Sequence, residues 1–373
     1  MFLQKLHIIN YRNIAQADIL LCEGINCFVG NNGAGKTNIL DTIYYLSFCK
    51  SYTNVADGLN ILHDQPFMVL QGEYLIDNIE ETIYCGIKRG RKKQFKRNKT
   101  DYVRITDHIG LLPLVIIAPA DDELITDSAE ARRKYMDYVI SQSDIMYLDA
   151  IMRYTKTLQN RNQHLKDLQE KIENRIPVDF ALLDILDEQL ATIGHYISNK
   201  RRSFVEWLRP IVQHIYSSIS SSKNENIDVE YFTGLDKYNL LEGLKESRNR
   251  DLILGYTSRG IHKDDITITY NGYPMKQVGS QGQRKSFVIS LKLAQYRYLE
   301  HVTKKSPILL LDDIFDKLDD TRGDNLIRFV ASESYGQIFI SDTNKERLVR
   351  LRNNINNKPF KIFDVNNGSI SES

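Results

Sequence analysis

Eight residues near the start of the chain have the composition and spacing of a phosphate-binding loop. Residues 30–37, GNNGAGKT, match the pattern GxxxxGK[ST]. Glycines in such a loop let backbone N–H groups point at phosphate oxygens, and the following helix adds its dipole. Lys36 would bring positive charge to the β- and γ-phosphates, and the Thr37 hydroxyl would bind Mg²⁺. The predicted nucleotide-binding residues are Gly30, Asn31, Asn32, Gly33, Ala34, Gly35, Lys36 and Thr37.

Two adjacent carboxylates follow an apolar strand much later in the chain. Residues 307–313, PILLLDD, contain four apolar residues, which is typical of a strand covered on both faces. The carboxyl ends of parallel strands are where α/β sheets bind ligands. We expect Asp312 to hold Mg²⁺, directly or through water, and Asp313 to orient or deprotonate the attacking water. The alternative is a strand capped by a turn with incidental acids. Lys36, Asp312 and Asp313 are the predicted catalytic residues.

A second helix start resembles a phosphate cradle. In residues 279–286, GSQGQRKS, Ser280 is a good N-cap and Gly282 allows close approach to the backbone. A cradle about thirty residues before the acidic strand is the arrangement of ABC-type ATPases. In those proteins the signature loop closes on the γ-phosphate bound by another subunit. An ordinary helix cap is the alternative. The residues expected to contact nucleotide are Ser280, Gln281, Gly282 and Gln283.

These motifs require a sheet that positions them. An apolar run at residues 25–30 precedes the first loop, and helical spacing predicts a helix from Lys36 to about Phe48. Residues 126–249 are mainly helical in pattern, and no heptad series lasts long enough for a long coiled coil. The predicted fold is an α/β ABC-type P-loop ATPase head. We expect residues 1–125 and 250–373 to form this head, and residues 126–249 to form a helical second lobe.

Charge is distributed unevenly along the chain. The net charge is +1, so any DNA contact must depend on local patches. Residues 88–99, KRGRKKQFKRNK, could form a phosphate-binding hairpin in which Phe95 stacks on a base; a solvated charged loop is the alternative. A second candidate is the run 132–134, Arg-Arg-Lys, for which structural salt bridges are the alternative. The expected DNA contacts are Lys88, Arg89, Arg91, Lys92, Lys93, Lys96, Arg97 and Lys99.

Composition and termini predict a cytoplasmic protein. No stretch approaches the roughly 18 apolar residues of a membrane helix, and the first residues lack the apolar core of a signal peptide. Cys22, Cys27, Cys49 and Cys85 form no CxxC pair, which favours reduced thiols over a disulfide or zinc site.

Taken in order, the motifs resemble those of the RecF family, the bacterial ABC-type ATPases of recombinational repair. The resemblance spans nearly the whole chain, from LHIINYRNI through GNNGAGKT to SQGQRKS and LLLDDIFDKLDD. RGIHKDDI is similar to the family's GPHRDD element, with Ile261 and Lys263 around His262. Asp316 and Lys317 replace a common Ser-Glu pair before Leu318 and Asp319.

The resemblance implies an ATP-driven homodimer with a slow, DNA-stimulated ATPase and with ATP and Mg²⁺ as cofactors. It implies work at gapped DNA or single-strand/double-strand junctions with RecR and RecO, in gap repair, replication restart and the SOS response. It also implies that Arg12 lies near the nucleotide and Asp342 near the γ-phosphate. An association with the nucleoid follows from this role. An ABC transporter ATPase subunit and a non-hydrolysing scaffold are the rival interpretations.

Overall fold

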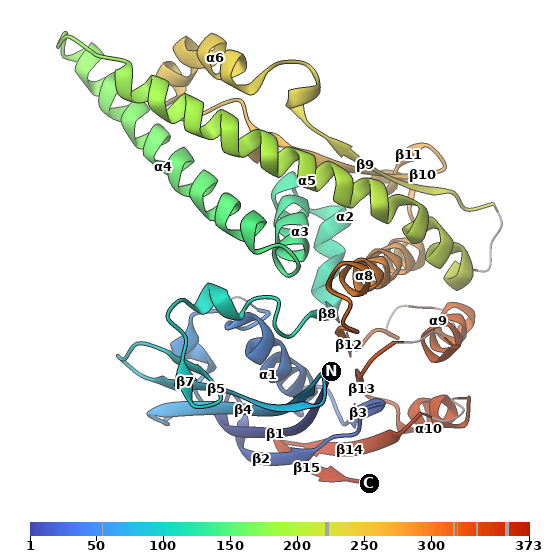
Figure 1. Ribbon diagram of the computed structural model, residues 1–373. Coiled ribbons are helices and arrows are strands. Elements are labelled where there is room, and N and C mark those ends of the chain that lie inside the picture. The colour runs from blue at the N-terminus through green and yellow to red at the C-terminus, as the bar shows by residue number, and fades with distance from the viewer. Residues whose placement is uncertain (54, 221–223, 316–317, 319, 333–334, 355–357) are drawn as a thin grey trace. The chain divides into compact units, whose positions relative to one another are not determined.

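The chain forms two compact units, each assembled from separate stretches of sequence. The computed structural model describes residues 1–53, 55–220, 224–315, 318, 320–332, 335–354 and 358–373 (Figure 1). Asp316, Lys317 and Asp319 lie outside the described residues. Unit 1 contains Met1–Asp122, His214–Glu225 and Ser280–Ser373, and unit 2 contains Glu123–Gln213 and Asn226–Gly279.

An antiparallel sheet makes up one layer of unit 1. Its strand order is β2-β1-β4-β5-β6-β7, and every pairing is antiparallel. Alternating burial along β4 and β5 shows that one face packs inside, against helix α1 among others, and the other faces outward. The bounds are β1 Phe2–Tyr11, β2 Ile14–Leu20, β4 Phe67–Ile76, β5 Ile79–Lys88, β6 Gln94–Arg97, β7 Thr100–Asp101 and α1 Lys36–Phe48.

The second sheet of unit 1 carries the predicted nucleotide motifs. Its order is β15-β14-β3-β13-β12-β8; the strands from β14 to β8 are parallel, and β15 is antiparallel. Strands β3, β8, β12 and β13 are buried along their whole lengths, as expected for a sheet covered on both faces. The bounds are β3 Ile25–Val29, β8 Leu114–Ile117, β12 Ile308–Asp312, β13 Ile338–Asp342, β14 Phe360–Asn366, β15 Ser369–Glu372, α8 Gln281–Thr303, α9 Asp320–Ser332 and α10 Lys345–Asn354.

Unit 2 is mainly helical and contains a small sheet of order β11-β10-β9. Its long helices have 29 and 40 residues, and residues of the second from His214 onward belong to unit 1. The bounds are α2 Glu123–Thr126, α3 Ala129–Ser141, α4 Ile145–Glu173, α5 Ala181–Ser220, α6 Leu240–Leu254, α7 Met275–Val278, β9 Ile227–Phe232, β10 Asp265–Tyr270 and β11 Tyr273–Pro274.

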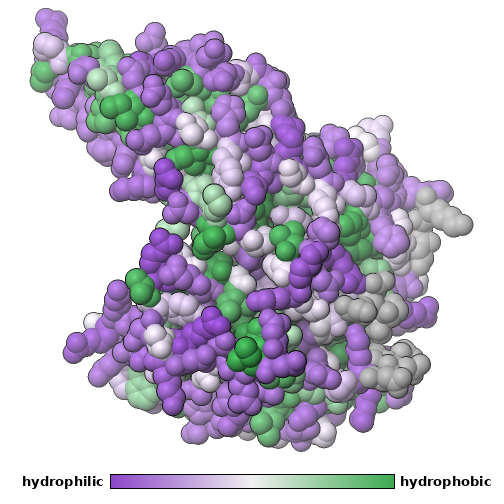
Figure 2. All heavy atoms as spheres, in the orientation of Figure 1, coloured by the Kyte–Doolittle hydropathy of each residue, from purple (hydrophilic) through white to green (hydrophobic). Residues whose placement is uncertain are grey.

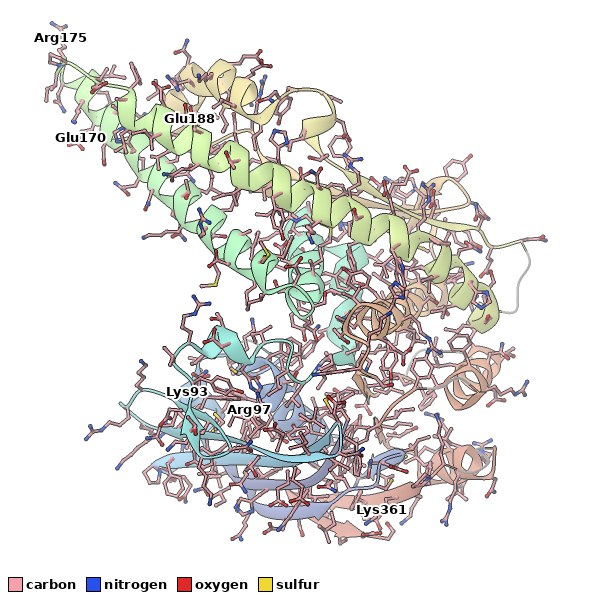
Figure 3. The ribbon with its side chains drawn as sticks, viewed as in Figure 1. Lys93, Arg97, Glu170, Arg175, Glu188 and Lys361 are labelled. Carbon is pink, nitrogen blue, oxygen red and sulfur yellow. The ribbon has the colours of Figure 1, made fainter. Side chains whose placement is uncertain are left out.

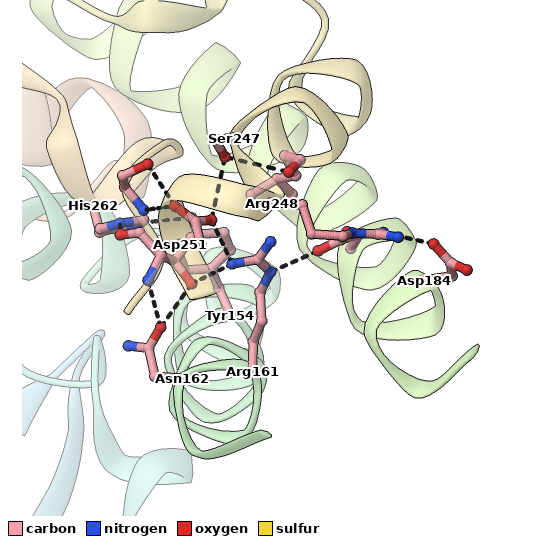
Figure 4. A network of polar contacts seen from close by, with 12 residues as sticks. Tyr154, Arg161, Asn162, Asp184, Ser247, Arg248, Asp251 and His262 are labelled. Carbon is pink, nitrogen blue, oxygen red and sulfur yellow. Dashed lines mark hydrogen bonds and ion pairs between the residues drawn. The ribbon is translucent and has the colours of Figure 1, made fainter. Parts of the chain in front are cut away.

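A buried ionic network connects the helices of unit 2 (Figure 4). Arg161 of α4 is fully buried and pairs with Asp187 of α5 at 2.6 Å and with Asp251 of α6 at 2.8 Å. Removing one partner of such a network leaves an uncompensated buried charge, which is strongly destabilising. His262 lies nearby, where the Tyr154 hydroxyl and the Thr257 carbonyl contact its ring nitrogens. Burial lowers the pKa of His262 to about 4, so the imidazole ring is neutral at pH 7.

The unit boundaries differ from the expected domain boundaries. The sequence placed residues 250–279 in the ATPase head, whereas Asn226–Gly279 belongs to unit 2. The reason is strand pairing: β10 pairs with β9 from Asp265↔Phe232 to Tyr270↔Ile227. Because a strand is held by its hydrogen-bonded neighbour, β10 lies with β9 in unit 2, and the last stretch of unit 1 begins at Ser280.

The molecular surface on view is mainly hydrophilic in both units, with smaller apolar groups (Figure 2). Among the described residues, no helix is both long enough and apolar enough to span a membrane.

Candidate nucleotide-binding site

The loop between β3 and α1 is held in the conformation that a phosphate cradle requires. Gly33 and Gly35 have φ angles of 80° and 118°, which glycine adopts at low cost. Asn13 donates from its amide to the Ala34 carbonyl at 3.1 Å. A Cβ at Gly35 would lie 2.9 Å from the Asn13 side chain. No side chain caps α1 at Gly35, so its first N–H groups point out of the helix end.

Lys36 and Thr37 start helix α1 and have different surroundings. The Lys36 side chain is only 4% exposed, and its Nζ donates to the carbonyls of Gly30 at 2.9 Å and Asn31 at 3.1 Å. The ammonium therefore lies against the curled loop. Thr37 is exposed, and its hydroxyl donates to Asp312 Oδ1 at 3.0 Å. The loop motif and the acidic strand, 275 residues apart in sequence, thus meet directly.

The acidic pair lies where β12 and β13 end together. Asp312 is in register with Ser341, whose hydroxyl donates to Asp312 Oδ1 at 2.6 Å and accepts from the Asp313 backbone N–H at 2.9 Å. Burial raises the pKa of Asp312, and the charge of Asp313 adds to this. The hydrogen bonds from Ser341 and Thr37 and the charge of Lys36 act in the opposite direction. Asp313 adopts a φ of 43°, which turns the chain away from the strand immediately after Asp312.

Asp342 ends β13 beside the loop. Its carbonyl accepts from the Gly30 N–H at 3.3 Å, and its carboxylate pairs with Arg347 of α10 at 3.0 Å. The Arg347 guanidinium also lies 5.2 Å from the ring centre of Phe315. The sequence did not predict Ser341, Arg347 or Asn13 as residues of this site. For Ser341, the polar end of the strand IFISD could have indicated a place at the ligand-binding edge of the sheet.

Arg12 is the centre of a hydrogen-bonded cluster in the turn after β1. Its guanidinium pairs with Asp41 at 2.8 Å and donates to Ser51 at 2.9 Å and Thr53 at 2.7 Å. Arg12 also lines a cavity of about 1070 Å³ that contains Leu59, His63 and Arg89. The Arg12 side chain is thus held by Asp41, Ser51 and Thr53, and the residue also borders a cavity.

The residues present fit a magnesium ion shared with phosphates. Mg²⁺ prefers oxygen ligands and usually takes one or two carboxylates together with phosphates and water. Thr37 and Asp312 bring a hydroxyl and a carboxylate oxygen within 3.0 Å of each other. Among the described residues no group of three or more His, Cys, Asp and Glu side chains is arranged as a metal site. The two oxygen ligands of Thr37 and Asp312 suit an ion whose other ligands would be phosphate and water.

The second candidate phosphate site lies at the N-terminus of helix α8. Ser280 is the N-cap, and a capping box is complete: the Gln283 N–H donates to the Ser280 hydroxyl at 3.3 Å, and the Ser280 N–H donates to Gln283 Oε1 at 2.9 Å. Gln283 also donates from its amide to Glu225 at 3.1 Å. Ser280 and Gln281 are exposed. Outside its own helix backbone, no described heavy atom lies within 4 Å of a Cβ placed on Gly282.

Comparison with known proteins identifies the family. The model for the RecF/RecN/SMC N terminal domain matches residues 2–371. The DNA replication and repair protein RecF of Bacteroides fragilis is 47% identical over 373 residues, covering 100% of this chain and 98% of the relative. The chain belongs to the RecF family. The Flavobacterium johnsoniae protein of the same name is 44% identical over 367 residues, covering 98% of this chain and 100% of the relative.

Solved structures agree with the RecF assignment. The recombination mediator protein RecF with ATP in the RecFOR pathway has 29% identity and a TM-score of 0.87, covering 100% of this chain and 97% of that one. The Smc head domain from Pyrococcus furiosus, at 15% identity and a TM-score of 0.58, matches in fold alone. The fold is the ABC-type ATPase head expected from the RecF resemblance.

The basic segment 88–99 of this RecF-family chain is divided between engaged and free side chains. Lys93 is turned inward, where it pairs with Asp57 at 2.9 Å and donates to the Cys49 carbonyl at 2.6 Å. Arg97 pairs with Glu81 through two nitrogens, and Lys96 lies 3.6 Å from Asp101 (Lys93 and Arg97 are labelled in Figure 3). Arg89 donates to the Gln65 carbonyl at 3.0 Å. The exposed members without a side-chain partner among the described residues are Lys88, Arg91, Lys92 and Lys99.

Two further DNA-binding candidates from the sequence, Phe95 and the run 132–134, contact other residues of the protein. Phe95 is 3% exposed and packs on His108 with ring centres 4.8 Å apart, so it offers no face to a base. In unit 2, Arg132 pairs with Asp265 at 2.6 Å and Lys134 with Glu130 at 2.7 Å. Arg133 donates to the Asp264 carbonyl at 2.7 Å. Arg132 and Lys134 thus have the ion pairs of the salt-bridge alternative, and Arg133 is bound to a backbone carbonyl.

Proposed function

We propose that this protein is an ATP-dependent DNA-binding ATPase of DNA replication and repair, acting as an ATP-driven homodimer. The observation that carries the proposal is the contact between Thr37 and Asp312 at 3.0 Å, beside Lys36 and Asp313. It joins a phosphate-binding loop to an acidic strand end, which is the arrangement needed to position a nucleoside triphosphate and a water. The RecF relatives are DNA replication and repair proteins, which supports the DNA role.

Each residue of this site has a proposed task. Lys36 neutralises phosphate charge, and Thr37 with Asp312 holds Mg²⁺, which supplies charge stabilisation to the phosphates when it is bound. Asp313, fixed by its N–H bond to Ser341, orients or deprotonates the attacking water. Asp342 would lie beside the γ-phosphate of bound ATP, and its pairing with Arg347 would offset repulsion between carboxylate and phosphate.

The dimer proposal depends on the unused groups at the start of α8. In the capping box the Ser280 hydroxyl accepts one hydrogen bond, so its own proton remains available to a phosphate oxygen. Gly282 leaves open space at the same surface. ATP bound by one subunit would be completed by Ser280 and Gly282 of another, so ATP becomes part of the interface and stabilises the dimer by mass action.

Sedimentation with a non-hydrolysable ATP analogue tests this interface. Wild type and Ser280→Thr, which keeps the hydroxyl, should dimerise, and Ser280→Arg should remain monomeric because the larger cation fills the contact. If Ser280→Arg dimerises as well as wild type, the signature does not act across subunits.

For DNA binding, the structure favours part of the basic segment. Lys88, Arg91, Lys92 and Lys99 have free side chains among the described residues, whereas Lys93 is engaged internally and is left out of the proposed surface. Replacing the four by Gln should weaken binding to duplex DNA across sequences and reduce the slope of log K against log salt by about 3–4. A matched control replaces four exposed lysines of unit 2, Lys156, Lys166, Lys171 and Lys245. An unchanged slope in the first variant would move the DNA site elsewhere.

The finer role that we propose is gap repair and replication restart, linked to the SOS response, together with RecR and RecO at the nucleoid. One similar solved structure is that of the recombination mediator protein RecF in the RecFOR pathway, which supports this proposed role. ATPase rate and dimer fraction should both rise with gapped DNA. Stimulation by membrane components instead would favour the transporter alternative. Absence of hydrolysis in a single-turnover assay would favour the scaffold.

A further inference from the structure

A groove on the outer face of the antiparallel sheet combines aromatic rings with free positive charge. The groove has a volume of about 570 Å³. Its lining residues are Phe67, Met68 and Val69 of β4, Tyr84, Gly86, Ile87 and Lys88 of β5, and Arg91, Lys92 and Gln94. It lies within unit 1. None of the residues that line the groove belongs to the nucleotide site described above.

Strand register explains how this groove forms. Phe67 pairs with Lys88, Val69 with Gly86, and Gly86 with Gln94, so these residues share one face of the sheet. Cys85, which lies between Tyr84 and Gly86, is buried on the opposite face. The groove is therefore an open sheet surface.

Gly86 creates the gap into which Tyr84 leans. A Cβ at Gly86 would lie 2.6 Å from the Tyr84 hydroxyl, so the phenol lies across the glycine. Phe67 is 39% exposed, so its ring is accessible from the groove that it lines. Two rings on a shallow, accessible face can each receive a flat apolar partner.

The charge at this site is positive only. Lys88, Arg91 and Lys92 are exposed, and none has a hydrogen bond or ion pair from its side chain to another described residue. No Asp or Glu is among the described residues that line the groove. Unpaired cations next to aromatic faces are the combination that single-stranded nucleic acid binders use, with bases stacked on rings and phosphates on Lys and Arg.

The structure assigns this groove as a binding site for an unpaired nucleotide of single-stranded DNA, with a base against Phe67 and Tyr84 and the flanking phosphates on Lys88, Arg91 and Lys92. The assignment rests on the proposed function in DNA repair, and it specifies where the single-stranded part of a gapped substrate is held. A duplex would engage the cations but not the rings, because its bases are stacked inside.

Equilibrium binding of the full chain with an ATP analogue tests the assignment, with a fluorescent oligo-dT and a blunt duplex as probes. Phe67→Ala with Tyr84→Ala should reduce oligo-dT affinity roughly 10- to 100-fold and change duplex affinity less than twofold. Tyr84→Phe should bind as wild type because the ring remains. Lys88→Gln with Arg91→Gln and Lys92→Gln should weaken both probes and flatten both salt slopes.

The control for a general aromatic effect is Tyr273→Ala, which removes a 66% exposed ring in unit 2 and should change neither affinity. An oligonucleotide carrying 5-iodouracil should cross-link at Phe67 or Tyr84. If the double alanine variant affects both probes equally or affects neither, the groove holds no base, although the DNA repair role stands. If wild type binds no DNA at all, the proposed function itself fails.

Discussion

The N-termini of α1 and α8 are both candidates for phosphate binding, but their hydrogen-bond donors are used differently. Helix α1 has Gly35 as its N-cap, without a side-chain cap. Asn13 and Asp312 hold the loop and Thr37 in place. Helix α8 has Ser280 as its N-cap, in a complete capping box with Gln283. The N-terminus of α1 presents backbone N–H donors that no side chain caps, and these can bind an anion. The N-terminus of α8 is capped by its own side chains, and it exposes Ser280 and the open space beside Gly282. One is a site within the chain, and the other has the properties of a half-site.

The strongest test of this contrast is to remove the cation of the α1 site. Lys36→Ala should reduce steady-state ATP turnover by at least about 100-fold, because a charged donor aimed at the transferring phosphoryl group is lost. Lys36→Arg should retain some nucleotide binding and also lose turnover. Lys50→Ala is the matched control, since Lys50 is exposed just beyond the end of α1. Full hydrolysis in either Lys36 variant would refute the assignment of the active site.

A smaller effect is expected at the α8 site. Ser280→Ala should leave ATP affinity of the monomer unchanged and lower the ATP-dependent dimerisation constant about tenfold, because one charge-assisted hydrogen bond to phosphate is lost. Loss of the cap should also lower the free energy of unfolding by roughly 1 kcal/mol. Sedimentation and denaturant titration measure the two effects. Equal loss of monomer ATP affinity would remove the distinction between the two helix ends.

Glycine substitutions should separate the two ends by the sign of their effect on stability. Gly35→Ala forces a side chain onto a φ of 118° and towards Asn13, so the free energy of unfolding should fall by roughly 1–2 kcal/mol. Gly282→Ala meets open space on a helix, so the free energy of unfolding should rise by roughly 0.5 kcal/mol. The second variant should nevertheless dimerise less well with ATP. If both variants are destabilised alike, α8 is packed in the monomer and is no half-site.

The mildest prediction concerns the buried carboxylate. The pKa of Asp312 is raised in the folded chain, mainly by burial, so folding favours its protonated form. That contribution is present below the ordinary pKa of 3.8 and is lost as pH rises through the raised value. At pH 7 the uncharged Asp312→Asn variant should therefore melt roughly 1–3 °C higher than wild type, and the difference should shrink on acidification. Its ATPase should be lost. A lower melting temperature at pH 7 would show that Ser341, Thr37 and Lys36 compensate the charge fully.

Part of the site was predictable because local sequence carries it. Residues 30–37 and 307–313 have dedicated spacings, and the structure confirms the strand before the loop and the helix from Lys36 to Phe48. Composition did not show that Lys93 pairs internally with Asp57 or that the Phe95 ring is buried against His108. Side-chain direction depends on strand register and on the neighbours Asp57 and His108, which composition does not reveal.

The sequence alone determined the family, the ABC-type ATPase fold and the identity of the loop and acidic-strand residues, because these follow from short motifs with fixed backbone requirements. Only the tertiary structure decided that Asp312 meets Thr37, that Asn226–Gly279 belongs to unit 2, and which cations of residues 88–99 are free. It also decided that Phe67 and Tyr84 line one groove together with Lys88, Arg91 and Lys92. These are contacts between residues far apart in the chain or across strands, and they are set by sheet register and packing.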